Sequence, residues 1–77
     1  MQKHTKVYFE HFDLGEQDVV LCEVCGAVAV DIHHIEGRGP GKDVIENLVG
    51  LCRDCHIRAG NDKAFNNSLK LLRNGTT

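Results

Sequence analysis

Two Cys-x-x-Cys pairs constrain the fold of this 77-residue chain more than any other feature: Cys22 with Cys25, and Cys52 with Cys55. Tetrahedral zinc takes four thiolates at about 2.3 Å, and two such pairs supply them. The alternatives are two disulfides, a redox-active pair or buried free thiols. No signal-peptide-like apolar segment follows the first residues, which weakens the disulfide alternative, and the duplication weakens the other two. We therefore predict one structural Zn²⁺ held by four cysteines.

Length and composition predict one small domain, residues 1–77, whose core depends on a metal. The chain is 42% hydrophobic, but Ala and Cys contribute to that figure, and only one Tyr and three Phe are present. No hydrophobic run approaches the length that crosses a membrane. We expect a cytoplasmic protein with reduced cysteines and no membrane partner.

The net charge of −2 argues mildly against a nucleic-acid partner, but the charges are unevenly distributed. Residues 1–32 carry two lysines against six acidic residues, a net charge of −4. Residues 33–77 carry seven cations against five acidic residues, a net charge of +2. The cations thus collect in the half of the chain that holds most of the unusual side chains, although a solvated surface gives the same pattern.

The hydrophobic pattern predicts an α+β fold. The predicted elements are a helix over 3–12, a strand over 27–35, a glycine-rich loop over 37–41, a strand over 48–51, a helix from 52 that stops near 60–61, and a helix over 62–72. We expect Asp43 to cap a brief turn through Glu46 and residues 74–77 to fray. Strand alternation places His33 and His34 on opposite faces.

Three histidines and an asparagine accompany the cysteine pairs: His33, His34, Asn47 and His56. A zinc module needs none of them. His56 follows Cys55 on a predicted helix, where successive residues point about 100° apart, so it can face away from the zinc. His33 and His56 can then share a second cation, unless the three are unrelated polar histidines. We expect His4 and His11 to be ordinary surface or core residues.

The order Cys-x-x-Cys, Asp-Ile-His-His-Ile, Asn-Leu-Val-Gly-Leu-Cys-x-x-Cys-His, running from Cys22 to Arg58, resembles the HNH endonuclease family. The resemblance implies a small ββα-metal domain with zinc knuckles, flanked by N- and C-terminal helices. It implies that His33 and His56 hold a catalytic divalent ion, that His34 is the general base, and that Asn47 steadies the loop and orients that base.

Two details of the implied metal site stay open. Some relatives carry a further histidine one helical turn after the second ligand, where this chain has Gly60, and Asn61 is a possible substitute. Asp31 is a possible partner for the other N–H of a ligand histidine, or an ordinary surface residue. Histidine ligands accept Mg²⁺, Mn²⁺, Ni²⁺ or Co²⁺ as the catalytic ion.

The implied function is hydrolysis of DNA phosphodiester bonds by one metal ion and a histidine base. Candidate phosphate contacts are Arg38, Lys42, Arg53 and Arg58, with solvated surface cations as the alternative. Nothing resembles a recognition helix, so we expect low sequence specificity, and a lone active centre favours nicking. We also expect a bacterial or phage-encoded protein, working alone, as a homodimer, or in a larger phage or restriction assembly.

Two other classes of function compete with nuclease activity. A zinc-binding module that binds nucleic acid or protein would need the four cysteines, but neither His34 nor Asn47. A redox protein would use its Cys-x-x-Cys pairs for thiol exchange.

Overall fold

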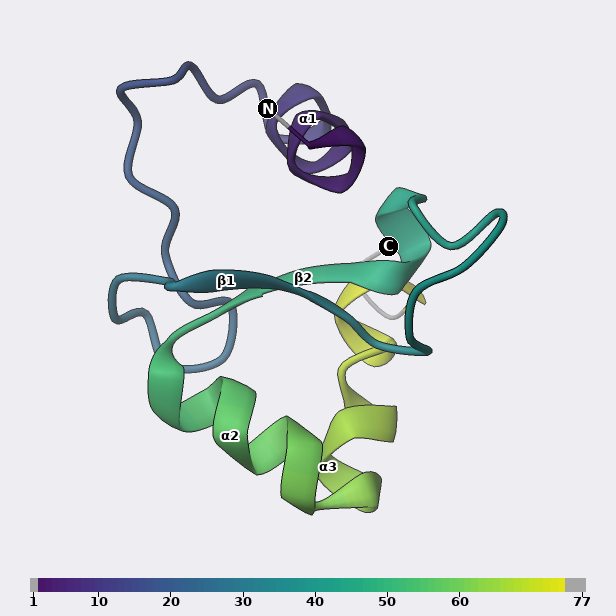
Figure 1. The fold of residues 1–77 in the computed structure, drawn as a ribbon. Coiled ribbons are helices and arrows are strands. Elements are labelled where there is room, and N and C mark those ends of the chain that lie inside the picture. The colour runs from purple at the N-terminus through teal and green to yellow at the C-terminus, as the bar shows by residue number, and fades with distance from the viewer. Residues whose placement is uncertain (1, 75–77) are drawn as a thin grey trace.

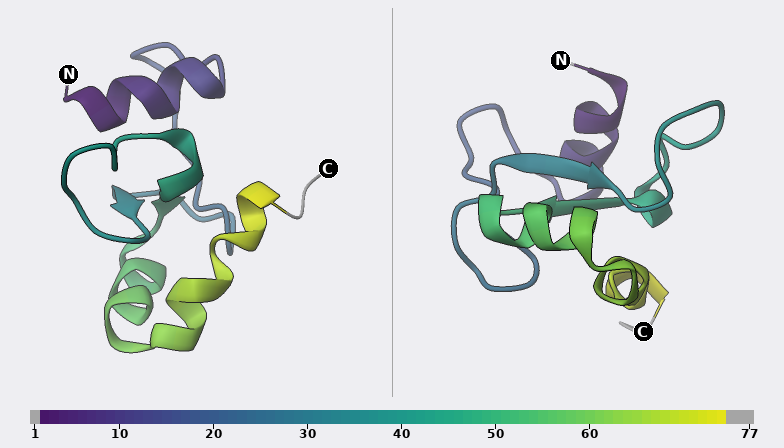
Figure 2. Two further views of the ribbon diagram at one scale, coloured as in Figure 1. Left: turned by 90° about the vertical axis from the view of Figure 1, so that its right-hand side faces the viewer. Right: turned by 60° about the horizontal axis from the view of Figure 1, so that its bottom comes forward.

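The computed structural model describes residues 2–74, which fold around a two-stranded antiparallel hairpin (Figure 1). The elements in chain order are α1 (Lys3–His11), β1 (Asp31–His34), the 3₁₀ helix η1 (Ile45–Asn47), β2 (Leu48–Leu51), α2 (Arg53–Asn61), α3 (Lys63–Ser68) and α4 (Leu71–Asn74). Helix α1 lies over one face of the hairpin, and α2 lies under the other (Figure 2). The predicted α+β class and flanking helices are confirmed. None of the helices within the described residues is long and apolar enough to cross a membrane.

The first strand is shorter than predicted. β1 begins at Asp31, whereas the pattern predicted a strand from residue 27. Residues 27–29 instead turn back on the segment before the first cysteine pair: Cys22 N–H donates to Ala27 O over 2.6 Å, and Ala29 N–H donates to Val20 O over 2.9 Å. The tight turn of residues 22–26, the first cysteine knuckle, brings residues 27–29 back against residues 20–22. Residues 27–29 therefore do not extend β1.

The final helix is broken into α3 and α4, where one helix over 62–72 was predicted. The break lies at Leu69 and Lys70, whose N–H groups bond three residues back, to Asn66 O and Asn67 O. The Ser68 hydroxyl donates to Phe65 O over 2.6 Å, a side-chain bond that competes with helical backbone bonding. Of the tail predicted to fray, Asn74 ends α4 and residues 75–77 lie outside the described residues.

The core has two parts, one on each face of the hairpin. Leu48 packs with Tyr8 and Ile32 on the α1 side, while Val49 and Leu51 pack with residues of α2 and α3 on the other. All four residues of β2 are buried. The register pairs His34 with Leu48 and His33 with Val49, which fixes which histidine faces which layer.

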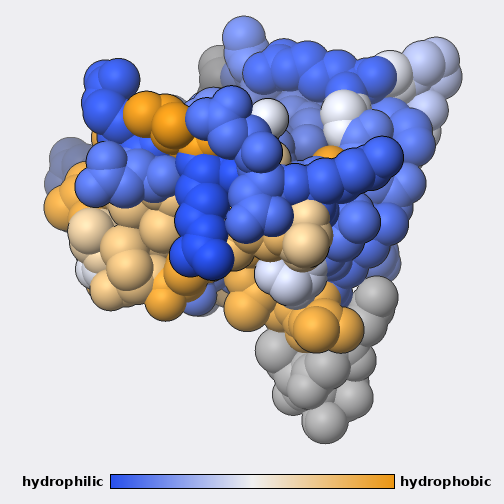
Figure 3. All heavy atoms as spheres, turned by 90° about the horizontal axis from the view of Figure 1, so that it is seen from below, coloured by the Kyte–Doolittle hydropathy of each residue, from blue (hydrophilic) through white to orange (hydrophobic). Residues whose placement is uncertain are grey.

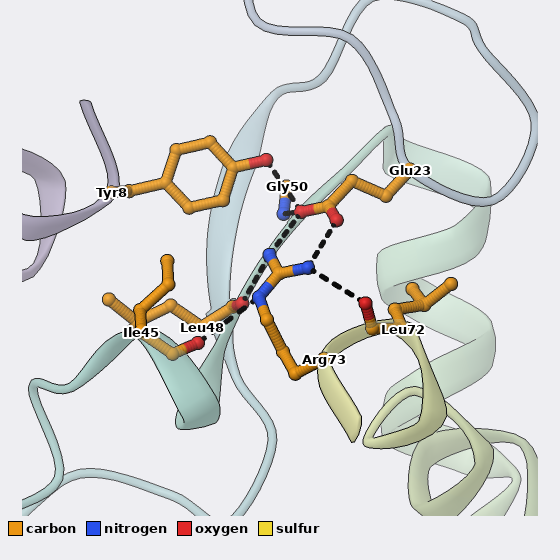
Figure 4. Close-up of polar contacts among 7 residues, drawn as sticks. All are labelled: Tyr8, Glu23, Ile45, Leu48, Gly50, Leu72 and Arg73. Atoms are coloured by element: carbon orange, nitrogen blue, oxygen red, sulfur yellow. Dashed lines mark hydrogen bonds and ion pairs between the residues drawn. The ribbon is translucent and has the colours of Figure 1, made fainter. Parts of the chain in front are cut away.

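A largely shielded ion pair joins the C-terminal helix α4 to the first cysteine knuckle (Figure 4). Arg73 donates to both carboxylate oxygens of Glu23 over 2.7 Å, and also to the carbonyls of Ile45 and Leu48. Glu23 accepts further hydrogen bonds from the Tyr8 hydroxyl over 2.6 Å and from Gly50 N–H over 3.0 Å. This network connects α1, the knuckle, the hairpin and α4.

Gly50 lets Tyr8 reach the ion pair. A Cβ at this position would lie 2.8 Å from the Tyr8 hydroxyl oxygen, closer than real Cβ atoms approach. Burial, followed by the hydrogen bond with Glu23, raises the pKa of Tyr8. Burial also raises the pKa of Glu23, but hydrogen bonds from Arg73, Tyr8 and Gly50 outweigh it and hold the pKa below its ordinary value. Glu23 is therefore an ionised acceptor at neutral pH.

Candidate metal centres

The four predicted zinc ligands, Cys22, Cys25, Cys52 and Cys55, meet at the end of the hairpin. Their sulfur atoms all lie within 4.8 Å of one another, and none of the four is in a disulfide. Gly26 adopts the positive φ of 84° that closes the first knuckle. Cys52 caps α2, and its Sγ accepts from Cys55 N–H over 3.5 Å. The cluster fits one tetrahedral zinc ion.

The pKa values of Cys22 and Cys55 also favour a bound cation at this cluster. Burial raises the pKa of Cys22, but backbone N–H groups that hydrogen-bond its sulfur outweigh burial and lower the pKa to about 6. Burial and hydrogen bonds with neighbouring thiols raise the pKa of Cys55 to about 12. These two thiols therefore do not ionise over the same pH range without a cation. A bound Zn²⁺ neutralises this charge and makes four thiolates compatible.

His33 and His56 lie side by side where β1 meets the first turn of α2. Their ring centroids are 5.1 Å apart and the rings are inclined at 65°. Both residues are partly buried, so solvent and small ligands reach part of each. The carboxylate of Asp31 lies 3.4 Å from His56 Nε2, so the acidic residue accompanies His56 rather than His33.

Asn66 on α3 orients His33, although no sequence motif marks this residue. The Asn66 amide donates from Nδ2 to Ile35 O over 2.8 Å, which turns Oδ1 toward His33 Nε2 at 2.7 Å. Because an amide oxygen only accepts, Nε2 carries the proton and the lone pair of a neutral His33 lies on Nδ1. Asn66 hydrogen-bonds a predicted ligand and is not itself the third ligand for which Asn61 was considered, so that role of Asn61 stays a prediction. The only sequence signal for Asn66 is a weak helix former in a predicted helix.

His34 lies on the opposite face of β1, covered by α1. Its Nε2 is 2.8 Å from Asp43 Oδ1, and its side chain is 4% exposed. The hydrogen bond with His34 lowers the pKa of the Asp43 carboxyl. The ionised carboxylate only accepts, so His34 Nε2 donates and its lone pair lies on Nδ1. The prediction that Asp43 caps a turn is wrong: Val44 precedes η1 without a side-chain cap, and Asp43 binds His34.

His4 on α1 lies beside His34 and Asp43, and the three residues form a cluster. Its ring lies edge-on to His34, with centroids 4.7 Å apart, and the residue is 5% exposed. Burial and then the proximity of His34 lower the pKa of His4. The residue thus belongs to a polar group inside the fold and is not an isolated core histidine.

Asn47 fastens both ends of the loop that follows β1. Its Oδ1 accepts from Glu36 N–H over 2.7 Å, and its Nδ2 donates to the carbonyls of Gly37 and Lys42 over 3.2 and 3.0 Å. Its own backbone carbonyl accepts from Ile35 N–H, next to His34. Asn47 is buried, so these bonds hold the loop closed beside the His34 backbone.

The predicted phosphate contacts are dispersed. Arg38 lies exposed in the loop, and Lys42 is 3.7 Å from Glu36. Arg53 and Arg58 are exposed on α2, where the Arg58 guanidinium lies 4.2 Å from the centre of the Phe65 ring. Figure 3 shows the side formed by α2 and α3, where hydrophilic residues cover much of the surface and apolar residues gather along part of it. The four cations thus lie on two separate segments, the loop after β1 and helix α2.

One of three comparisons with known proteins finds a match. A family model described as HNH endonuclease matches residues 22–62, which is more than half of the chain. The matched segment contains both cysteine pairs, the hairpin and α2. No curated protein and no solved structure matches the chain.

Proposed function

Because the chain belongs to the HNH endonuclease family, we propose that it is a metal-dependent endonuclease that hydrolyses phosphodiester bonds of DNA. The observation that carries the proposal is the pairing of His33 with His56, whose ring centroids lie 5.1 Å apart within the matched segment. A structural zinc site made of four cysteines needs neither histidine. A second, open cation site that performs hydrolysis does need such ligands.

We assign the catalytic cation to His33 and His56, separate from a structural Zn²⁺ at the four cysteines. Asn66 fixes the His33 ring so that Nδ1 carries the available lone pair. The Asp31 carboxylate beside His56 adds negative charge that favours a cation. When bound, Mg²⁺, Mn²⁺, Ni²⁺ or Co²⁺ supplies positive charge that stabilises the phosphate in the transition state.

We assign the general base to His34. Its hydrogen bond to Asp43 holds the proton on Nε2, so Nδ1 can accept a proton from the attacking water. The side chain is 4% exposed under α1, and we therefore expect DNA binding to displace α1 or the loop of residues 37–44 before water reaches Nδ1. Asn47 limits this movement, because its three hydrogen bonds keep the ends of the loop together.

The DNA backbone would be bound through cations around this centre, with the low sequence specificity expected of phosphate contacts. The candidates are Arg38, Lys42, Arg53 and Arg58. A single reaction centre per chain cuts one strand at a time, so nicking is the expected product. A homodimer or a larger assembly would be needed for a coordinated double-strand break.

Supercoiled plasmid, incubated with the zinc-loaded protein and each of the four divalent metals or EDTA, tests the proposal. We expect nicking with metal, none with EDTA, and none from His34→Ala at unchanged zinc content. The matched control is His11→Ala, because His11 is an exposed histidine on α1. Nicking by His34→Ala at the wild-type rate would exclude His34 as the base. A wild-type protein inactive with every metal would exclude the nuclease proposal.

One observation favours a second candidate, a zinc module that binds nucleic acid or protein without cutting it. The side chain of His34 is covered by α1 and hydrogen-bonded to Asp43. This is the environment of a residue that stabilises the fold. In that case His34→Ala would destabilise the fold, and binding of DNA or protein would be independent of the added metal and of His33.

A further inference from the structure

Three side chains from separate segments meet between α1 and the hairpin: His4 on α1, His34 on β1 and Asp43 in the loop. One possible ligand atom from each lies within 4.8 Å of the other two. Both histidines are buried, and Asp43 is partly exposed, so the group opens to solvent at its carboxylate side.

The position of the His4 ring carries the argument. Its centroid lies 4.7 Å from that of His34, edge-on, and the residue is 5% exposed. Among residues 2–74 no side-chain nitrogen or oxygen is both fully buried and without a hydrogen-bond partner, so solvent reaches any His4 nitrogen that the protein does not bind. An imidazole open to solvent beside a second histidine and a carboxylate makes a donor set suited to a transition-metal ion.

We propose that His4, His34 and Asp43 form a third metal site, specific for a borderline cation such as Zn²⁺ or Co²⁺. Imidazole and carboxylate bind Zn²⁺ at about 2.0–2.2 Å, which sets ligand atoms about 3.4 Å apart in a tetrahedron. The ligand atoms lie within 4.8 Å of one another, and His34 Nε2 is 2.8 Å from Asp43 Oδ1, so side-chain adjustment is needed to reach this geometry. Three protein ligands leave a fourth position for water on the partly exposed side of Asp43.

This site is distinct from the His33 and His56 pair, because His34 and His33 project from opposite faces of β1. The two sites therefore take metal independently. His33 and His56 lie on the α2 side, and the new site lies on the α1 side.

Occupation of the site would switch off His34 as a base, a consequence that rests on the proposed function. The metal takes the lone pair of Nε2, so the proton now on Nε2 moves to Nδ1 and the ring stays neutral. Nδ1 then has no lone pair with which to accept a proton from water. An excess of Zn²⁺ would thus inhibit the reaction while structural zinc remains in place.

Cobalt titration of the full chain tests metal binding apart from activity. The parent variant is His56→Ala with the cysteines loaded with zinc, so that the catalytic pair and the thiolates do not contribute. We expect one Co²⁺ to bind with the visible absorption of a tetrahedral site. Adding His4→Gln or Asp43→Asn should weaken binding at least tenfold, while adding His11→Gln should leave it unchanged. Circular dichroism establishes that each variant is folded. Equal Co²⁺ binding by folded parent and Asp43→Asn proteins would overturn the site.

Inhibition of plasmid nicking tests the consequence. With Mg²⁺ in excess, we expect added Zn²⁺ to inhibit the wild type, and at least tenfold more Zn²⁺ to be needed for His4→Gln. Equal inhibition of both proteins would overturn the regulatory role. A wild type that never nicks DNA would refute the proposed function only, because the cobalt titration would still decide whether the site exists.

Discussion

Arg73 donates two hydrogen bonds of 2.7 Å to the carboxylate of Glu23, although fifty residues separate them in the chain. The side chains are 9% and 17% exposed, so the ion pair is largely shielded from water. The ion pair joins helix α4 to the knuckle that carries Cys22 and Cys25. This polar contact between α4 and the turn that carries the first cysteine pair thus supplements the small hydrophobic core.

Arg73→Ala should destabilise the zinc-loaded protein by about 3–5 kcal/mol, because it leaves the buried Glu23 carboxylate without its cation. Urea unfolding followed by circular dichroism measures the change. The matched control is Arg53→Ala, which removes an exposed cation and should change stability by no more than about 0.5 kcal/mol. Equal midpoints for the two variants would show that the clamp does not contribute.

Acid should remove the contribution of Glu23 to stability. Its pKa in the folded protein is depressed below the ordinary value of 4.5, so its stabilisation is fully present above that pH and is lost as pH falls through the folded pKa. Acid also protonates the cysteines, but equally in wild type and Glu23→Gln. The stability difference between these two proteins should therefore be constant above about pH 5 and shrink below it. A difference that stays constant down to the acid transition would contradict the role of the Glu23 charge.

Asn66→Ala should weaken binding of the catalytic cation about 10–100-fold, because it frees the His33 ring from the orientation that presents Nδ1. Calorimetric titration of the zinc-loaded protein with Mn²⁺ or Ni²⁺ measures the affinity. Asn67→Ala is the matched control, since Asn67 is the exposed neighbour on α3. Equal affinities in both variants would mean that Asn66 has no influence on the cation.

Cys52→Ser should lose zinc and unfold, because Cys52 is both a ligand and the residue that caps α2. Metal analysis after gel filtration and the far-ultraviolet circular dichroism spectrum test this expectation, and chelation of the wild type should have the same effect. Substitution of Ser68 by Ala provides a control outside the cluster. A folded, zinc-free Cys52→Ser protein would contradict the structural site.

The elements that local patterns specify were predicted well. The Cys-x-x-Cys spacing, the alternation through His33 and His34, and the apolar run of β2 each depend on near neighbours, and each element is present. The extent of β1 and the break between α3 and α4 were predicted wrongly. The extent of β1 depends on the turn made by the first cysteine pair, and the break between α3 and α4 accompanies hydrogen bonds that compete with the helical pattern. Propensity and hydrophobic pattern do not decide either competition.

The sequence alone determined the order of the metal-binding residue types, the faces on which the two adjacent histidines project, and the α+β class. Only the tertiary structure decided the partner of each histidine: Asn66 for His33, Asp31 for His56, and Asp43 with His4 for His34. These partners come from other elements and lie up to 33 residues away in the chain. The physical reason is that strand alternation depends on backbone geometry, whereas each imidazole contact depends on how separate helices pack against the hairpin.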